Sequence, residues 1–541
     1  MKNRLTRRFA ALAVLPVLAL TLAGCGDGKG EAEQSADVAV PGDAAADEVV
    51  VAITAEPEGG FDSTAGWGHG TTPLIQSTLV EYTQDMRIVN DLATDWGVSE
   101  DGVTWTFDMR DDAYFTDGEP VLASDVVFTF KQAQESQSSL DLSYMVDVEA
   151  NGEHEVVFTM DAPNSPFINT VAAIGIVPEH AYDQDYANHP IGSGPWKMVE
   201  WKKGEQVILE RNDDYYGDLP NLKKATILFM EEDAAFTAAK AGQVNVALTS
   251  PTHATQEIDG MRIEAVSTLD NRGITLPLSP DEGKTTEDGY PIGNDVTSSQ
   301  AVRHAIAYGV NRERLAEDAV NGYATPAYSE DDGLPWNNPE VVIEEDVEYA
   351  KQLLDEDGWV EKDGVREKDG VEAEFTVYYP SGDSARQALG MATAQQLEEL
   401  GIRMNVEGKS WEEIQKLMFS NPILMGWGST NPYTSYLLYH SDNSLKDDYY
   451  NPEGLSDPVI DAYLEAALHA QTQEEADEQW KLAQWDGETG TSMRGVAPWV
   501  WLLNLDHIYY VDDGLDIGDQ QLHGHGASWT LLQNLSHWSW N

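Results

Sequence analysis

Residues 375–406 read FTVYYPSGDSARQALGMATAQQLEELGIRMNV, and the spacing of their apolar side chains changes twice. Within 375–379 apolar residues alternate with others, which is typical of a half-buried strand. From 385 to 400 they recur at helical spacing, Gly401 ends the helix, and alternation resumes in 402–406. A strand, a helix and a second strand in this order predict an α/β fold.

Other segments of the chain also carry regular patterns. Residues 104–110 (TWTFDMR) and 154–160 alternate, which predicts two more strands, and 302–310 has the spacing of an amphipathic helix. We expect the acidic segments 329–332 and 361–370 to be solvated connections. A chain of 541 residues is too long for one hydrophobic core, so two or three domains are expected.

The first 25 residues have the layout of an exported lipoprotein. Four basic residues precede an apolar run, Phe9–Leu20, which is too short to span a bilayer comfortably. The run leads to Leu22-Ala23-Gly24-Cys25, which resembles a bacterial lipobox, so we expect lipidation of Cys25 and a place on the outer face of the cell membrane. An ordinary signal peptide with a cysteine at its cleavage site is the alternative. Residues 26–47 hold no aromatic side chain, and we expect a disordered tether.

Composition excludes several classes of protein. The chain has 32 basic and 94 acidic residues, a formal charge of −62, so repulsion excludes nucleic acid as a partner. Such acidity suits either a saline habitat or an acidic cell-surface protein. Cys25 is the only cysteine, which leaves no disulfide framework or thiolate metal site. Nucleophile elbow, HExxH and P-loop motifs are not found, so we expect a binding protein rather than a secreted hydrolase or another enzyme.

Three groups of motifs follow one another along the chain. They are Trp105–Arg110 with Ala113–Pro120 and Ala123–Val126; Ile176–His180 with Pro190–Trp196 and Glu210–Gly217; and Ala301–Ile306 with Asn311-Arg312 and Gly322–Pro326. Together they resemble the dipeptide-, oligopeptide- and nickel-type family of bacterial ABC-importer solute-binding proteins, whose first motif is W-x-F-x-L-R…F-x-D-G-x-P…A-x-D-V. Most of these residues suit structural roles. Gly192, Gly194 and Pro195 favour a sharp chain reversal between domains, and Arg110 and Asp125 are expected to form a scaffold ion pair.

The resemblance implies a two-lobed, hinged, periplasmic-binding-protein-like α/β fold with an additional subdomain. The first lobe is expected from 48–90, 190–285 and 506–541, the additional domain from 91–189, and the second lobe from 286–505. A ligand in the cleft would contact both lobes only in the closed state, which a membrane permease would read. We expect a monomer with no resident cofactor.

Two features bear on the ligand. Peptide-binding members of the family typically hold the α-ammonium with an aspartate after a Gly-Trp motif, whereas Gly426-Trp427 is followed here by Asn431, which gives up the charge-assisted bond. Arg386 opens a helix after a strand, where it could clamp a ligand carboxylate. A surface or ion-paired arginine is the alternative for Arg386.

Histidines flanked by glycines suggest a metal. The segments are Gly66-Trp67-Gly68-His69-Gly70 and Leu522-His523-Gly524-His525-Gly526. Because glycines supply no packing walls, we expect exposed imidazoles, with His523 and His525 pointing the same way. Imidazole suits nickel, and the segments resemble the nickel branch of the family, which implies that His69, His523 and His525 complete the coordination of a small chelate such as nickel-histidine. Hydrogen-bonding loop histidines are the alternative. Three tryptophans would supply apolar walls: Trp67, Trp427 and Trp529.

The sequence thus predicts an extracytoplasmic receptor that binds a nickel chelate and delivers it to an ABC permease. A dipeptide or oligopeptide receptor is the alternative. A peptide-sensing or adhesion lipoprotein without a permease also stays open.

Overall fold

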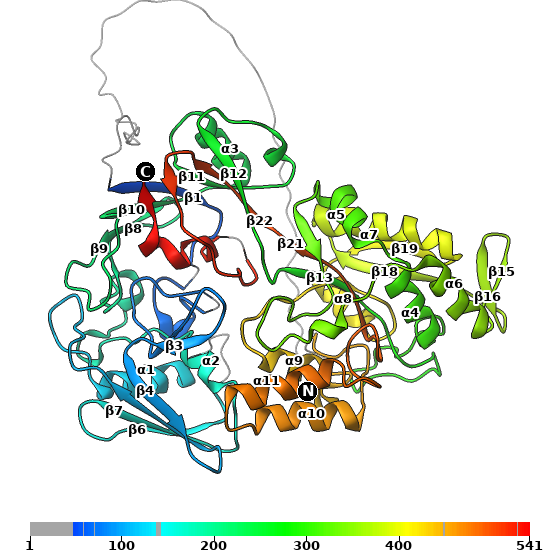
Figure 1. The fold of residues 1–541 in the computed structure, drawn as a ribbon, viewed down its shortest axis with the longest axis horizontal. Coiled ribbons are helices and arrows are strands. Elements are labelled where there is room, and N and C mark those ends of the chain that lie inside the picture. The colour runs from blue at the N-terminus through cyan, green and yellow to red at the C-terminus, as the bar shows by residue number, and fades with distance from the viewer. Residues whose placement is uncertain (1–46, 58, 70, 137–141, 447–448, 527) are drawn as a thin grey trace, which may run out of the picture. The chain divides into compact units, whose positions relative to one another are not determined.

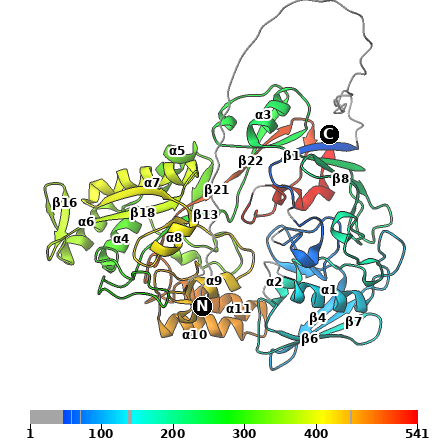
Figure 2. The same ribbon diagram turned by 180° about the vertical axis from the view of Figure 1, so that it is seen from behind.

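The structure is a computed structural model that describes residues 47–57, 59–69, 71–136, 142–446, 449–526 and 528–541. Over these residues helices are combined with seven β-sheets (Figures 1 and 2). The predicted signal segment, Cys25 and most of the tether lie outside the described residues. In the part of the chain that is described, no helix is both long and apolar enough to cross a membrane.

The first lobe is built on a seven-stranded sheet in the order β12-β22-β11-β1-β10-β9-β8. Its strands are β1 (Glu48–Ile53), β8 (Trp196–Lys202), β9 (Gln206–Arg211), β10 (Lys224–Phe229), β11 (Val246–Thr249), β12 (Met261–Val266) and β22 (His507–Asp512). β1 runs parallel to β10 and β11, and alternate residues Val49, Val51 and Ile53 enter one core. Ala52 on the opposite face packs with α3 (Glu232–Lys240). The sheet therefore has apolar cores on both faces.

A four-stranded antiparallel sheet, β4-β5-β7-β6, has a core of its own with α1 (Ala123–Glu135) and α2 (Phe167–Val171). The strands are β4 (Ala93–Val98), β5 (Thr104–Met109), β6 (Met145–Ala150) and β7 (Glu155–Met160). Phe107 of β5 packs edge-to-face on Phe158 of β7, with ring centroids 5.6 Å apart. The strands predicted over 104–110 and 154–160 are confirmed, and we call this unit the additional domain.

The second lobe contains the strand–helix–strand unit. β18 (Glu374–Pro380) and β19 (Arg403–Lys409) are parallel and are joined by α7 (Ser384–Leu397), which confirms the prediction for 375–406. A sheet in the order β14-β21-β13-β20 and further helices complete its core. These elements are β13 (Asn271–Thr275), β14 (Ala324–Pro326), β20 (Leu424–Met425), β21 (Trp499–Leu505), α4 (Gln300–Gly309), α5 (Arg312–Val320), α6 (Val347–Glu356), α8 (Trp411–Leu417), α9 (Tyr433–Tyr439), α10 (Pro458–Leu468) and α11 (Gln473–Gln484). The helix predicted over 302–310 is α4.

β13 lies inside the stretch 190–285 that the sequence assigns to the first lobe, yet it pairs with β20 and β21. The domain boundaries themselves stay a prediction. Short strands complete the secondary structure: β2 (Val80–Tyr82), β3 (Ile88–Asn90), β15 (Val360–Lys362), β16 (Val365–Lys368), β17 (Val371–Glu372), β23 (Leu515–Asp516) and β24 (Ser539–Trp540).

The two acidic segments that the sequence predicts to be solvated connections differ in burial. In 329–332, Glu330 is 4% exposed and accepts a hydrogen bond from the hydroxyl of Tyr439 at 2.8 Å. Asp331 is 3% exposed and accepts one from the indole of Trp336 at 3.0 Å. Residues 361–370 fall largely in the β15–β16 hairpin. The prediction is wrong for 329–332, because partners elsewhere in the chain bury its carboxylates, whereas Glu361, Asp363 and Asp369 in 361–370 are exposed.

Two motif residues have other partners than the sequence predicts. Arg110 pairs with Asp112 at 2.6 Å, while Asp125 accepts a backbone hydrogen bond at the start of α1, so the predicted Arg110–Asp125 pair is wrong. A Cβ added to Gly192 would lie 2.0 Å from the carbonyl oxygen of Ile75. Glycine is therefore required here by a close backbone approach.

Buried carboxylates make the stability of the protein depend on pH. Burial raises the pKa of Glu453 to about 8 and that of Asp331 to about 7. The folded chain therefore keeps protons that the unfolded chain releases near about pH 4. The free energy of unfolding thus falls as the pH rises from about 4 to about 8. We expect Glu453→Gln to remove about 3–4 kcal/mol of the loss between about pH 5 and about pH 8. Urea unfolding at both pH values measures this, and an unchanged loss in the variant would contradict it.

Candidate ligand-binding site

One cavity of about 620 Å³, here the Trp427 cavity, has walls from the additional domain and from the second lobe, and His525 of the C-terminal segment also lines it. Its lining is Tyr144, Asn164, Pro166, Thr170, Gly426, Trp427, Gly428, Ser429, Asn431, Tyr433, Thr434, Leu437, Tyr450 and His525. Trp427 stacks on Tyr450 with ring centroids 4.7 Å apart and forms an aromatic wall. The volume suits a small-molecule ligand, which would touch both sides.

Polar contacts join the same two parts of the chain beside this cavity. The side-chain amide of Asn431 donates a hydrogen bond to the hydroxyl of Thr170 at 3.2 Å. Tyr82 and Asn169 both donate to the carbonyl of Thr430, at 3.0 and 3.3 Å. The amide of Asn431 is thus already engaged in a contact between the lobe and the additional domain.

A charge cluster borders the Trp427 cavity. Asp270 accepts hydrogen bonds from Arg272 at 2.5 and 3.1 Å and lies 2.6 Å from Nδ1 of His525. Burial alone would raise the pKa of Asp270, but the charge of Arg272 and the bond to His525 outweigh it and hold this pKa well below its usual range. The side chain of His525 is 52% exposed and lines the cavity, so Asp270 orients an accessible imidazole.

Arg386 lies near this cluster without lining the cavity. It sits in the first turn of α7, and its guanidinium binds the carboxylate of Asp383, the residue that caps that helix. Burial lowers the pKa of Arg386, the charge of Arg272 adds to this effect, and Asp383 and Asp270 oppose it. The positive charges of Arg272 and Arg386 therefore repel each other. The sequence predicted a role for Arg386 but not for Asp270 and Arg272, which lie just before and within the short strand β13 and carry no local signal.

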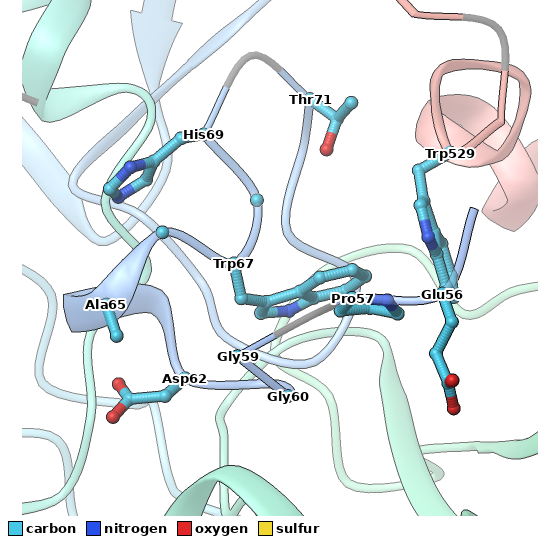
Figure 3. Close-up of a pocket in the computed structure, with 12 residues that line it drawn as sticks. Glu56, Pro57, Gly59, Gly60, Asp62, Ala65, Trp67, His69, Thr71 and Trp529 are labelled. Atoms are coloured by element: carbon cyan, nitrogen blue, oxygen red, sulfur yellow. The ribbon is translucent and has the colours of Figure 1, made fainter. Parts of the chain in front are cut away.

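A smaller cavity of about 280 Å³, here the Trp67 cavity, belongs to the first lobe (Figure 3). Trp67 and Trp529 meet edge-to-face with ring centroids 4.8 Å apart, and both pack on Phe61. His69 lines the same cavity and donates from Nε2 to the carbonyl of Ser63 at 2.9 Å. Burial lowers the pKa of His69 to about 4, so its imidazole is neutral at physiological pH.

Backbone geometry explains the glycines of this loop. Gly66 and Gly68 have φ values of +123° and +81°, in the region that favours glycine.

His523 is buried, although its glycine neighbour predicts an exposed imidazole. Its side chain is fully buried, and its Nδ1 lies 3.1 Å from Nδ1 of His507. Burial lowers the pKa of His523 well below its usual value, and repulsion from His507 adds to this. The expectation of an exposed imidazole is wrong for His523, because β22 and its neighbours supply the walls that Gly524 does not. It also does not share the exposure of His525.

Six of the eight residues predicted to bind ligand or metal thus line two cavities. Trp427, Asn431 and His525 line one, and Trp67, His69 and Trp529 line the other. Among the described residues, no group of three or more His, Cys, Asp or Glu side chains is arranged to hold a metal ion. The predicted trio of histidines is therefore not assembled around one point, and its role stays a prediction.

An α/β chain with two lobes and a small-molecule cavity between parts of them has the architecture of an extracytoplasmic solute-binding protein. The model of the bacterial extracellular solute-binding proteins, family 5, matches residues 87–448, and the chain belongs to this family. Proteins of this family bind small solutes or peptides outside the cytoplasm and deliver them to an ABC permease, so the chain is a binding protein and not an enzyme.

Individual relatives cover most of the chain. It is 29% identical over 503 residues to protein XP55 of Streptomyces lividans, covering 89% of this chain and 88% of that one. It is 26% identical to the oligopeptide-binding protein AppA of Bacillus subtilis, covering 82% and 85%. The structure of NikZ from Campylobacter jejuni in complex with Ni(L-His) aligns with a TM-score of 0.70 at 23% identity, covering 91% and 99%. This last likeness confirms the two-lobed fold.

Proposed function

We propose that this protein captures nickel as a small chelate, such as nickel-histidine, in the Trp427 cavity. The observation that carries the proposal is the 2.6 Å contact between Asp270 and Nδ1 of His525. Histidines that bind metals typically give their other ring nitrogen to a carboxylate, which fixes the tautomer and raises the basicity of the ligating nitrogen. With Nδ1–H donated to Asp270, the Nε2 lone pair of His525 is the metal ligand. The chelate itself would supply the remaining ligands, as nickel in the NikZ structure comes with histidine.

The chelate brings a carboxylate as well as a metal. Arg272 and Arg386 lie close enough to interact electrostatically, and in this proposal their charges attract the carboxylate from outside the cavity lining, where Asp270 and Asp383 partly offset them. Arg272 is held by both oxygens of Asp270, so its guanidinium keeps one orientation. In this proposal Arg386 contributes positive charge without lining the cavity, while Trp427 and Asn431 line it.

His69 requires a further step. It lines the Trp67 cavity, whereas His525 lines the Trp427 cavity, and both belong to the segments assigned to the first lobe, so a movement of the lobes would not bring them to one nickel ion. We therefore assign the protein ligand to His525 alone and give His69, Trp67 and Trp529 no part in binding the nickel ion. Cys25 would anchor the protein to the membrane beside its permease.

Calorimetric titration of the purified protein tests this function. We expect saturable heat with nickel plus free histidine, and a weaker response to nickel alone. His525→Ala should weaken the affinity about 10- to 100-fold, because it removes the protein ligand. His469→Ala serves as a matched control, since His469 is exposed at the end of α10.

The same titration with di-, tri- and longer peptides examines the alternative. An oligopeptide receptor is favoured by the likeness to AppA along 82% of the chain. Heat with peptides only, or an undiminished nickel-histidine affinity in His525→Ala, would overturn the nickel proposal and leave the peptide receptor.

A further inference from the structure

A third cavity, here the Trp480 cavity, has a volume of about 770 Å³ and is larger than either cavity described above. One wall is β4 and β5 of the additional domain, with Trp96 and Trp105, and the other is α11 of the second lobe, with Asp477, Trp480 and Lys481. Its volume is in the range of small-molecule sites. None of the eight residues predicted from the sequence to bind ligand or metal lines it.

The contact that flanks this cavity is built from specific hydrogen bonds. Ser165, which also lines the cavity, donates from its backbone to the carbonyl of Leu468 at 2.9 Å and from its hydroxyl to that of Ala467 at 2.7 Å. These are carbonyls of the last turn of α10, where the regular hydrogen bonds of the helix end. The additional domain and α10 are thus held together beside the cavity, and an occupant would touch both.

The wall from the additional domain presents an aromatic face. Trp96 stacks on Trp105 with ring centroids 5.7 Å apart and ring planes at 26°, and Trp105 in turn meets Phe167 edge-to-face. Trp105 is 4% exposed and is fixed in the core, whereas Trp96 is only partly buried. Trp96 therefore offers the supported, accessible ring on which a flat apolar group can stack.

The wall from α11 presents two opposite charges. Asp477 and Lys481 are four residues apart, so their side chains lie on one face of the helix about 5–6 Å apart at Cβ. Burial raises the pKa of Asp477 to about 6; Lys481 opposes this, Glu474 adds to it, and no hydrogen bond from a described residue contributes. A partly buried carboxylate without a hydrogen-bond donor favours a cationic ligand group, and Lys481 beside it favours an anionic one.

We propose that the Trp480 cavity binds an aromatic amino acid as its zwitterion, with the side chain on Trp96, the ammonium on Asp477 and the carboxylate on Lys481. An α-amino acid carries its ammonium and its carboxylate on one carbon atom, so the two groups can face a carboxylate and an ammonium one helical turn apart. The aromatic group then points away from α11 toward the opposite wall. This site is separate from the Trp427 cavity and does not depend on the nickel proposal.

The test is titration of the purified protein with L-phenylalanine, followed by tryptophan fluorescence and calorimetry. We expect saturable binding, with the affinity at least tenfold lower in Asp477→Asn and in Trp96→Leu, and unchanged in His525→Ala. Glu478→Gln, at an exposed position on the same helix, is the matched control and should bind as the parent does. Two further probes isolate the parts of the ligand: 3-phenylpropionate lacks the ammonium and L-alanine lacks the ring, and both should bind at least tenfold more weakly.

Several outcomes would overturn the proposal: no saturable binding, an undiminished affinity in Asp477→Asn, or 3-phenylpropionate binding as tightly as phenylalanine. Loss of binding in His525→Ala would place the ligand in the Trp427 cavity and overturn it as well. A melting curve shows whether Trp96→Leu folds. If it does not, the affinity of Asp477→Asn for L-phenylalanine tests the proposal by itself, since Asp477 lies at a partly exposed helix position.

Discussion

Asp270→Asn should lower the free energy of unfolding by about 3–5 kcal/mol, because it removes one partner of a buried ion pair. The side chains of Asp270 and Arg272 are 13% and 9% exposed, so the guanidinium left behind cannot recover its hydration. Arg386 nearby makes the loss worse, since Asp270 also offsets its charge. Urea unfolding of parent and variant at neutral pH measures the change.

Asp318→Asn is the control for that experiment. Asp318 pairs with Arg314 at 3.2 Å, but the two side chains are 49% and 61% exposed, so removing this pair should change stability little. Because the pKa of Asp270 lies below its usual value, the stability it adds is present above about pH 4 and is lost only on acidification. Equal stability of Asp270→Asn and the parent at neutral pH would contradict a structural role for the pair. The nickel-histidine affinity should also fall, as His525 loses the group that fixes its tautomer.

The local spacing of apolar residues was enough to predict individual strands and helices of the fold. The alternation in 104–110 and the strand–helix–strand pattern of 375–406 each predict an element that the structure contains. Such patterns report which side chains share a face, and that depends only on neighbours along the chain. The family motifs extended this to the two-lobed architecture, which no periodicity could have supplied.

Burial of polar groups could not be predicted in this way. Glu330 and Asp331 look like a solvated acidic turn, yet Tyr439 lies 109 residues from Glu330 and closes over it. His523 and His525 share the same glycine-rich surroundings in sequence. In the structure His523 is buried beside His507, whereas His525 is half exposed and pairs with Asp270. Whether a polar residue is walled in is decided by distant segments, so the candidate site was found in part and its charge cluster was missed.

The glycines of the Gly426-Trp427-Gly428 motif illustrate the same limit and lead to the second large effect. The sequence presents them as part of a ligand-binding motif, whereas the structure gives them a packing role. A Cβ on Gly426 would lie 1.7 Å from the carbonyl oxygen of Asn271, at the point where β20 ends beside β13. A backbone carbonyl in a sheet cannot move aside as a flexible side chain can, so the two strands must separate.

Gly426→Ala should therefore destabilise the protein by about 4 kcal/mol, near the upper end for a single substitution. The added methyl would also lie 3.3 Å from Nη1 of Arg272, so nickel-histidine affinity should fall in whatever protein still folds. Gly97→Ala is the matched control, because a Cβ there meets nothing within 4 Å in the exposed strand β4. Thermal and urea unfolding of both variants decide the matter. Equal stability of the two variants would mean that β13 and β20 can separate freely. It would contradict the view that their rigid pairing positions Asp270, Arg272 and Trp427 around the cavity.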